Sequence, residues 1–338
     1  MRLPIRELGV VLLGVAVVPK AGGAQAGVQL HQADRARLAE GRQLADRVRD
    51  QLWPGWGNTP FQVLLVGDSV EFLVSDQRHP AGFSPLGYDL MLGAEVWTRP
   101  RQFSPTLLAT FPAVGGLPTI VIGSAENTGK SSTAWVMTLL HEHFHQWQCS
   151  QPDYYTGVSR LGLARGDTTG RWMLDYPFPY DSAPVQRAVR SLAQSLSRAL
   201  KAGSAERGRA LKAVSDDRDS LRNLLTSADY RYLEFQLWQE GVARYIEYAA
   251  ARAAAEAWEP SADFRSLPDY RPYGETAGDA LRDLRRELDQ LDLARQRRVA
   301  FYPIGATIAL LLNETRPDWK RAYTRQRFAL ADLLPMGR

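Results

Sequence analysis

The sequence predicts an α+β protein in which an N-terminal mixed β-sheet is followed by a mostly α-helical half. Two observations carry this prediction. Short apolar runs bounded by Gly, Pro and Asp occupy much of residues 61–122, as is typical of strands. Beyond residue 150, long segments favour helices instead. We therefore expect an α/β subdomain over residues 27–150 and a helical subdomain over residues 151–338.

The individual elements follow from local composition. A first helix decorated with Arg, Asp and Glu is predicted over residues 33–52, and Trp53-Pro54-Gly55 ends it. The β-like runs are 61–66, 70–74, 95–98, 107–111 and 119–122. The later helices are predicted at 184–202, 206–226, 230–257, 276–299, 304–313 and 319–333. The Pro-, Gly- and Tyr-rich stretches at 175–184 and 260–274 are predicted to be loops.

The first residues predict an export signal over residues 1–26. Arg2 and Arg6 precede a short apolar run at Gly9–Val18, and Ala24-Gln25-Ala26 fits a small-x-small cleavage site. The run is shorter than the about 20 apolar residues that span a bilayer. We expect cleavage near Ala26 and a periplasmic or extracellular protein without stable membrane insertion. The alternative is a retained membrane anchor.

Composition narrows the class further. Cys149 is the only cysteine of the 338 residues, so the core must hold the chain together without an intrachain disulfide. The net charge is only +4, and the basic residues are scattered among acidic ones. A nucleic-acid-binding surface is therefore not expected. The oligomeric state is left open.

The most specific motif is His141-Glu142-His143-Phe144-His145, which has the form H-E-x-x-H. Hydroxyl groups at residues 131–133 can cap a helix, and the apolar stretch that follows predicts a buried one. On a helix, His141 and His145 project from the same face, where two imidazoles can bind one zinc ion. Glu142 can then reach a water on that metal. The alternative is a surface helix whose histidines form local hydrogen bonds.

A third metal ligand must come from elsewhere, because a catalytic zinc commonly has three protein ligands and one open position. The longer motif H-E-x-x-H-x-x-G-x-x-H is not present, since Gln148 and Gln151 occupy its Gly and last His positions. A later carboxylate is the remaining option, and Glu240 is the best candidate. Gly241 and Ala243 beside it would allow close approach to another helix.

Other assignments remain open at this point. Glu240 can instead form an ordinary i,i+4 ion pair with Arg244. In that case the next candidates for the third ligand are Glu234, Glu247 and His79.

The H-E-x-x-H motif followed by Glu-Gly-x-Ala-x-Tyr at residues 240–245 resembles the gluzincin-type zinc metallopeptidases. The resemblance covers two predicted helices, roughly residues 133–148 and 230–250. It implies a thermolysin-like architecture with one zinc ion, and Glu142 as the general base. The zinc ligands that it implies are His141, His145 and Glu240.

The chain departs from the thermolysin-like pattern at Arg244, where that pattern has an Asp that orients a histidine. Glu247, two turns after Glu240, is the candidate for this supporting role. The oxyanion of a tetrahedral intermediate needs a donor besides the metal, and Tyr245 and Tyr302 are candidates. Both can equally be core tyrosines.

Three residues near the motif are assigned lesser roles. His143 is expected to face away from the metal and to be structural. Gln146 can support the site or contact substrate, and Cys149 is expected to be a buried small residue.

These assignments predict an exported zinc metallopeptidase that hydrolyses peptide bonds of a peptide or protein substrate with a metal-activated water. A strand beside the motif helix, either 95–98 or 107–111, would hold the substrate by β-augmentation. The alternatives are a catalytically silent zinc-binding or scaffold protein and a zinc amidase acting on non-peptide or cell-wall amides. An intact Glu142 argues against the silent alternative, because a zinc scaffold does not need that carboxylate.

Overall fold

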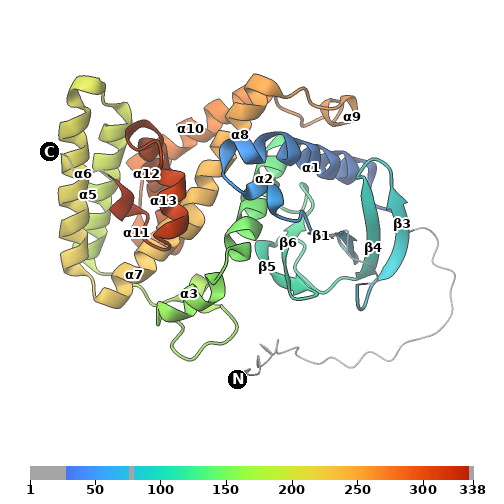
Figure 1. The fold of residues 1–338 in the computed structure, drawn as a ribbon, viewed down its shortest axis with the longest axis horizontal. Coiled ribbons are helices and arrows are strands. Elements are labelled where there is room, and N and C mark those ends of the chain that lie inside the picture. Colours follow the sequence, from blue (N-terminus) through green and yellow to red (C-terminus); the bar gives the residue numbers. More distant parts are fainter. Residues whose placement is uncertain (1–27, 76–79, 335–338) are drawn as a thin grey trace.

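The computed structural model describes residues 28–75 and 80–334. The predicted signal peptide at 1–26 and the candidate ligand His79 lie outside the described residues. Figure 1 shows a β-sheet at one end of the molecule and a hairpin of helices α5 (Ala183–Lys201) and α6 (Ser204–Leu224) at the other, with helix α2 (Ser132–Ser150) between them. The prediction of an α+β protein with a mostly helical second half is confirmed.

A six-stranded mixed sheet forms the N-terminal part, in the order β3-β4-β2-β1-β6-β5. Strand β1 pairs with β6 in parallel, and all other neighbours are antiparallel. The strands are β1 Val63–Val66, β2 Val70–Val74, β3 Ser84–Asp89, β4 Ala94–Pro100, β5 Leu108–Val114 and β6 Leu117–Gly123. The sequence did not predict β3, because this edge strand is almost wholly exposed and therefore lacks an apolar run.

Alternate residues of the central strand β1 face opposite sides of the sheet. Val63 and Leu65 pack against helices α1 Gln32–Leu52 and α2 Ser132–Ser150 in the main core of this half. Leu64 and Val66 belong to a smaller apolar cluster on the other side. The helical layer therefore covers one face of the sheet and places α2 at the centre of the molecule.

Helix α2 begins where the sequence predicts, because Ser131 caps it by accepting a hydrogen bond from the Ala134 amide at 3.4 Å. The Trp135 indole donates to the Gly123 carbonyl at 2.8 Å and so ties the helix to the end of β6. Its residues from Ser132 to Gln148 are buried with the exception of Ala134. The helix that carries the H-E-x-x-H motif thus has no continuous solvent face.

The second half consists of helices, of which α8 packs along α2 while α5 and α6 lie at the far end of the molecule (Figure 1). The long ones are α5 Ala183–Lys201, α6 Ser204–Leu224, α7 Ser227–Gln236, α8 Val242–Ala257, α10 Tyr273–Asp289 and α12 Phe301–Thr315. The short ones are α3 Tyr154–Arg160, α4 Trp172–Asp175, α9 Ala262–Arg265, α11 Leu293–Gln296 and α13 Trp319–Arg325. A five-residue π-helical segment, η2 Leu237–Gly241, joins α7 to α8 without a loop.

Two predicted helices are shorter than the sequence suggested. The helix predicted over 276–299 ends at Asp289, and the chain resumes in α11 and in the 3-10 turn η3 Arg297–Ala300. Arg297 has a φ of 53°, which an L-residue does not adopt within a helix. The helix predicted over 319–333 likewise ends at Arg325, before Phe328 with a φ of 62°.

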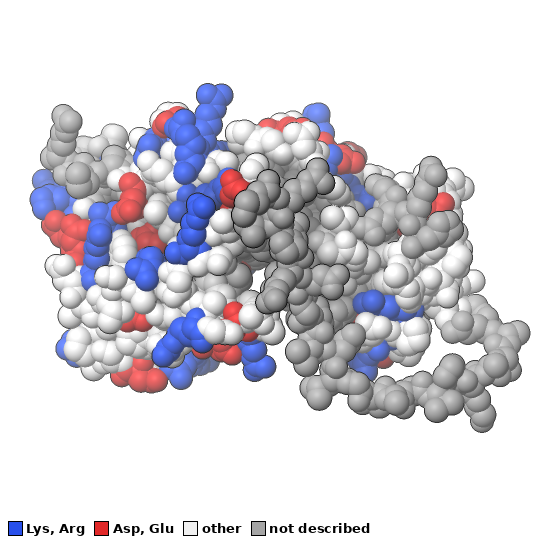
Figure 2. Space-filling view, turned by 60° about the horizontal axis from the view of Figure 1, so that its bottom comes forward, with Lys and Arg blue, Asp and Glu red and all other residues white. Residues whose placement is uncertain are grey.

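The surface carries both charge signs. Figure 2 shows basic and acidic side chains interspersed over the helical half on the visible face. Within residues 28–75 and 80–334, none of the helices combines the length and the apolar character that a membrane-spanning segment needs.

Candidate metal centre

The two outer histidines of the motif meet on one face of α2, as their spacing predicts. The Nε2 atoms of His141 and His145 lie 3.1 Å apart, and both side chains are buried. The two rings are nearly perpendicular, at 77°. Because the two Nε2 atoms point to one place, a single ion there could accept a lone pair from each.

Glu240 completes this group from the second half of the chain. Its Oε2 atom lies 3.4 Å from Nε2 of His145 and 3.7 Å from Nε2 of His141. The three ligand atoms all lie within 4.8 Å of one another. Two imidazoles and a carboxylate, converging in a largely buried position, can hold a metal ion. The carboxylate that the sequence favoured is therefore brought to the histidines.

The π-helical segment η2 helps to aim Glu240. A π turn rotates the residues that follow it relative to a regular α-helix, and such turns are frequent at functional sites. Gly241 packs so closely on helix α12 that a Cβ atom there would lie 2.4 Å from the Cα of Gly305. The close approach predicted for Gly241 thus exists, but it joins η2 to α12 instead of joining it to α2.

Neighbouring charges shift the pKa values of Glu240 and His141. Burial alone would raise the pKa of Glu240, but attraction by His145 and His141 holds that pKa well below its usual value. Burial would lower the pKa of His141, yet the carboxylates of Glu240 and Glu247 raise it to about 10. Without a metal the cluster therefore pairs an ionised Glu240 with a protonated His141, and a bound metal ion would take the place of that proton.

Glu247 supports His141 from behind. Its Oε1 atom lies 2.8 Å from Nδ1 of His141, so the carboxylate accepts the Nδ1 proton and leaves Nε2 toward the cluster. Its Oε2 atom accepts from Arg244 at 2.5 Å, and Arg244 also donates to Glu287 at 3.3 Å. Arg244 thus serves Glu247 and Glu287, and the alternative ion pair between Arg244 and Glu240 does not form among the described residues.

Gln148 supports His145 through its Nδ1 atom, as Glu247 supports His141. Its Oε1 atom lies 2.5 Å from Nδ1 of His145, while its Nε2 donates to the Gln239 carbonyl at 3.0 Å and to the Tyr323 hydroxyl at 2.6 Å. These contacts fix which way the amide points. Sequence reasoning noted Gln148 only as a departure from a longer motif, although its place three residues after His145 is a usable signal.

Glu142 lies beside the cluster and against the edge of the sheet. The Thr110 hydroxyl on β5 lies 2.8 Å from Oε2 of Glu142 and 3.0 Å from its carbonyl oxygen. Glu142 is 5 % exposed. Strand β5 is an outer strand of the sheet, paired only with β6 among the described strands. Of the two candidate strands, 107–111 therefore reaches the motif helix at Glu142, whereas β4 lies inside the sheet.

Tyr302 and Tyr245, the two tyrosines considered as oxyanion donors, are placed differently. Burial and the negative charge of Glu240 raise the pKa of Tyr302 well above its usual value. Tyr302 is therefore a neutral phenol at the cluster. The Tyr245 hydroxyl accepts instead from Asn313 at 2.7 Å, and its ring lies edge-on to Trp319 at 5.9 Å.

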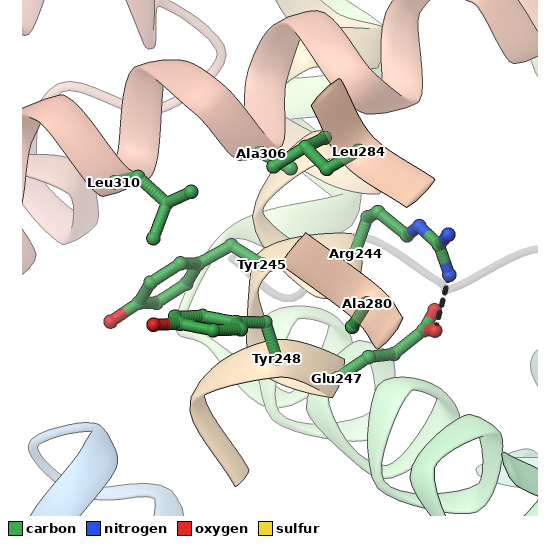
Figure 3. A pocket seen from close by; sticks show the side chains of 8 residues that line it. All are labelled: Arg244, Tyr245, Glu247, Tyr248, Ala280, Leu284, Ala306 and Leu310. Atoms are coloured by element: carbon green, nitrogen blue, oxygen red, sulfur yellow. Dashed lines mark hydrogen bonds and ion pairs between the residues drawn. The ribbon is translucent and has the colours of Figure 1, made fainter. Parts of the chain in front are cut away.

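Figure 3 shows that Tyr245 and Tyr248 point to one side of a small pocket, whereas the Arg244–Glu247 ion pair lies on the other. Since Glu247 is the partner of His141, the Tyr245 hydroxyl is directed away from the metal ligands. The structure does not bring Tyr245 to the site.

The remaining motif residues face the sheet and the core. Nδ1 of His143 lies 2.9 Å from Oε1 of Gln146, and burial lowers the pKa of His143 to about 3, so that it stays neutral. Gln146 donates to the carbonyls of Gln62 and Pro118, both at 2.9 Å, and does not reach the cluster. Cys149, predicted to be buried, is only partly buried against the helical core, and desolvation there raises its pKa to about 12. All three are structural.

Glu234, the other described alternative for the third ligand, lies elsewhere. It accepts from the Tyr230 hydroxyl and from the Ala331 amide, both at 3.0 Å. It therefore anchors the C-terminal segment instead of approaching the histidines.

Comparison of the chain with protein-family models, with curated proteins and with solved structures found no match. The site must therefore be interpreted from its own geometry.

Proposed function

We propose that the protein is an exported zinc-dependent peptidase. The observation that carries the proposal is the convergence of His141, His145 and Glu240, with Glu142 next to His141 in the chain and close enough for its charge to act on that histidine. Two imidazoles and one carboxylate, with a position left for water, suit zinc better than the harder cations, which prefer oxygen ligands. The resemblance to gluzincin-type metallopeptidases agrees with this ligand set, and the sheet and helical half meeting over the cluster suggest a thermolysin-like architecture.

In the proposed reaction, His141, His145 and Glu240 would hold a zinc ion, which would supply a polarised water and a Lewis acid for the substrate carbonyl. Glu142 takes the proton of the water as it attacks and delivers it to the leaving amine. The Thr110 hydroxyl holds Oε2 of Glu142 by a 2.8 Å hydrogen bond and leaves Oε1 as the oxygen that we assign to proton transfer. Tyr302, kept neutral beside Glu240, is the donor that we assign to the developing oxyanion.

We assign the substrate-binding strand to β5. It is an edge strand with unpaired backbone groups along one side, and its Thr110 contacts Glu142 directly. A peptide added antiparallel or parallel to β5 would therefore pass the proposed general base. This arrangement favours an extended peptide or protein segment as the substrate.

Elemental analysis and peptide turnover test the proposal together. The mature chain is expected to hold about one zinc and to cleave a general protein or a peptide panel. Glu142→Gln should keep the metal and lose roughly 10²–10⁴ of the turnover rate, because only proton transfer is removed. Glu256→Gln, an exposed change on α8, is the matched control and should change neither quantity.

Two outcomes would replace the proposal. Bound zinc with no turnover in either the wild type or Glu142→Gln would favour a silent metal-binding protein. Cleavage of peptidoglycan fragments without cleavage of any peptide would favour the amidase alternative. Absence of metal after preparation with zinc and without chelator would remove the enzymatic interpretation altogether.

A further inference from the structure

An arginine lies on the side of Glu240 that faces away from the two histidines. Oε2 of Glu240 is directed to the histidines, whereas Oε1 lies 3.7 Å from Nη1 of Arg298. The same Nη1 atom donates to the Tyr302 hydroxyl at 2.5 Å. The Arg298 side chain is 24 % exposed, so it is largely withdrawn from water while one part still reaches it. Arg298 therefore contacts the proposed ligand Glu240, whose carboxylate separates it from the two histidines.

Arg298 has more hydrogen-bonding capacity than its neighbours use. A guanidinium carries five N–H donors, and the bond to Tyr302 is the only hydrogen bond found for this one in the described part of the chain. The other arginine near the cluster differs, because Arg244 is engaged by Glu247 and Glu287. Burial would lower the pKa of Arg298, but the neighbouring Tyr302 and Glu240 raise it, so the side chain remains a cation.

The backbone that presents Arg298 is held in an unusual conformation. Arg297 has φ 53° and ψ −134°, a region that L-residues rarely adopt and that persists where surrounding contacts hold it. Those contacts are present: Arg297 donates to Asp181 at 2.8 Å and lies over the Tyr180 ring at 5.0 Å. Ala300, on the other side of Arg298, is fully buried. Arg298 is thus fixed at the edge of the site.

The charges around Arg298 indicate which kind of group it can bind. Once a metal is bound, the charge of Glu240 is shared with that ion, and the 3.7 Å contact to Arg298 becomes a weak counter-charge. A largely buried cation without a good partner is unfavourable, and a guanidinium matches a carboxylate with two parallel hydrogen bonds. An uncharged stretch of peptide offers no such group.

We propose that Arg298 binds a carboxylate of the substrate close to the scissile bond, so that the site prefers peptides carrying a negative charge there. The inference rests on the proposed peptidase function. The carboxylate can be the C-terminal one, which would make the enzyme a carboxypeptidase, or an acidic side chain. Both sources share the chemistry that Arg298 recognises, and peptides can distinguish them.

Calorimetric titration of the zinc-loaded Glu142→Gln protein tests this, since binding is then measured without cleavage. Three peptides of otherwise identical sequence are compared: one with a free C-terminal carboxylate, one amidated, and one amidated with a Glu beside the scissile position. At least one charged peptide is expected to bind about ten- to a hundredfold tighter than the neutral amide. The charged peptide that does so identifies the source of the carboxylate.

Substitution of Arg298 supplies the decisive comparison. Arg298→Gln in the same background should abolish the preference and leave the Kd of the neutral amide unchanged. Arg298→Lys should keep part of it, because the charge stays while the forked geometry is lost. Arg295→Gln removes a charge from an exposed position three residues earlier and should leave the preference intact.

Three results would overturn the inference. In the first, all three peptides bind equally to the parent protein. In the second, Arg298→Gln weakens all of them alike. In the third, that variant loses zinc by elemental analysis, which would make Arg298 a support of Glu240. Failure of the peptidase proposal can be told apart from failure of this inference. A zinc-loaded protein that binds the charged peptide through Arg298 but cleaves no peptide would contradict only the proposed catalysis.

Discussion

The metal cluster is built from two helical regions that differ in how they place their ligands. On α2 an unbroken α-helix brings His141 and His145 together through the i,i+4 spacing alone. On the other side, Glu240 lies in the π-helical η2, and Gly241 next to it is packed against Gly305 of α12. The first pair is fixed by local geometry, whereas the third ligand depends on a helix interruption and on a neighbouring helix.

The two histidines also differ in what holds their second nitrogen. His141 is backed by the carboxylate of Glu247, whereas His145 is backed by the amide of Gln148. A carboxylate makes an imidazole a stronger electron donor than a neutral amide does. The two ligands from α2 are therefore expected to contribute unequally to metal affinity.

Removing a metal ligand from either region should cause the largest loss of bound zinc. His145→Ala and Glu240→Ala are each expected to reduce bound zinc from about one ion per chain to a small fraction, because three protein ligands are the usual minimum for such a site. Elemental analysis after dialysis measures it, with Glu256→Ala on α8 as the control. Zinc retained by Glu240→Ala would show that only α2 carries the site.

Gly241→Ala should disturb the packing of η2, the segment that carries Glu240, without changing any of the three metal ligands. The new Cβ would lie 2.4 Å from the Gly305 Cα, a backbone atom that cannot move away alone. We expect a loss of at least about 3 kcal/mol of unfolding free energy, at the upper end for overpacking, together with weaker zinc binding. Urea unfolding and a zinc competition assay measure the two effects.

The control for this change is Gly208→Ala on α6, where no atom outside the local helix lies within 4 Å of the added Cβ. That substitution should stabilise the chain by up to about 1 kcal/mol through helix propensity. A Gly241→Ala protein as stable as the wild type would show that α12 does not fix η2.

The pH dependence of the unfolding free energy offers a further test, through Glu234 of helix α7, which runs into η2. Burial, with Asp332 nearby, raises its pKa from 4.5 to about 7. Between these values the folded chain binds more protons than the unfolded chain, so stability falls as pH rises from about 4.5 to 7. Glu234→Gln should remove roughly 2–3 kcal/mol of this fall, as measured by urea unfolding at several pH values. An unchanged pH slope in the variant would contradict the assignment.

The smallest changes in zinc affinity are expected for substitutions of Glu247 and Gln148, the residues that support the two histidines. Glu247→Gln is expected to weaken zinc binding by about 10- to 100-fold, because His141 loses its carboxylate partner. Gln148→Ala should weaken it less, since His145 loses only a neutral acceptor. A chelator competition series gives both affinities, and His141 and His145 remain present throughout. Equal effects would mean that the difference between carboxylate and amide has no influence here.

The contrast between the two regions also explains what the sequence could predict. The α+β class, helix α2 and the placement of His141 and His145 depend on local patterns, and the structure agrees with them. Strand β3 was missed because its residues are exposed and held mainly by pairing with β4. Nothing periodic in the sequence marks the π turn, and the close approach of Gly241 to Gly305 beside it joins residues far apart in the chain.

The site residues divide in the same way. Glu247 was considered as a support for a histidine from its spacing on the helix, and it bonds to His141. Gln148 lies at a helical spacing from His145 that could have marked it, although its further contact with Tyr323 depends on the fold. Arg298 could not be assigned from spacing, because its contact with Glu240 joins residues far apart in the chain. Tyr245 satisfied the sequence pattern but bonds to Asn313, on α12.

The cluster draws its ligands from residues 141 and 145 in one half of the chain and from residue 240 in the other. These residues lie together only in the folded chain, so an ion held by them binds the folded state and not the unfolded one. Free metal at a hundred times its Kd would then add about 2.7 kcal/mol to the unfolding free energy. The melting temperature of the protein should consequently rise with the logarithm of free zinc concentration, and thermal melting becomes a direct reading of the affinity of the site.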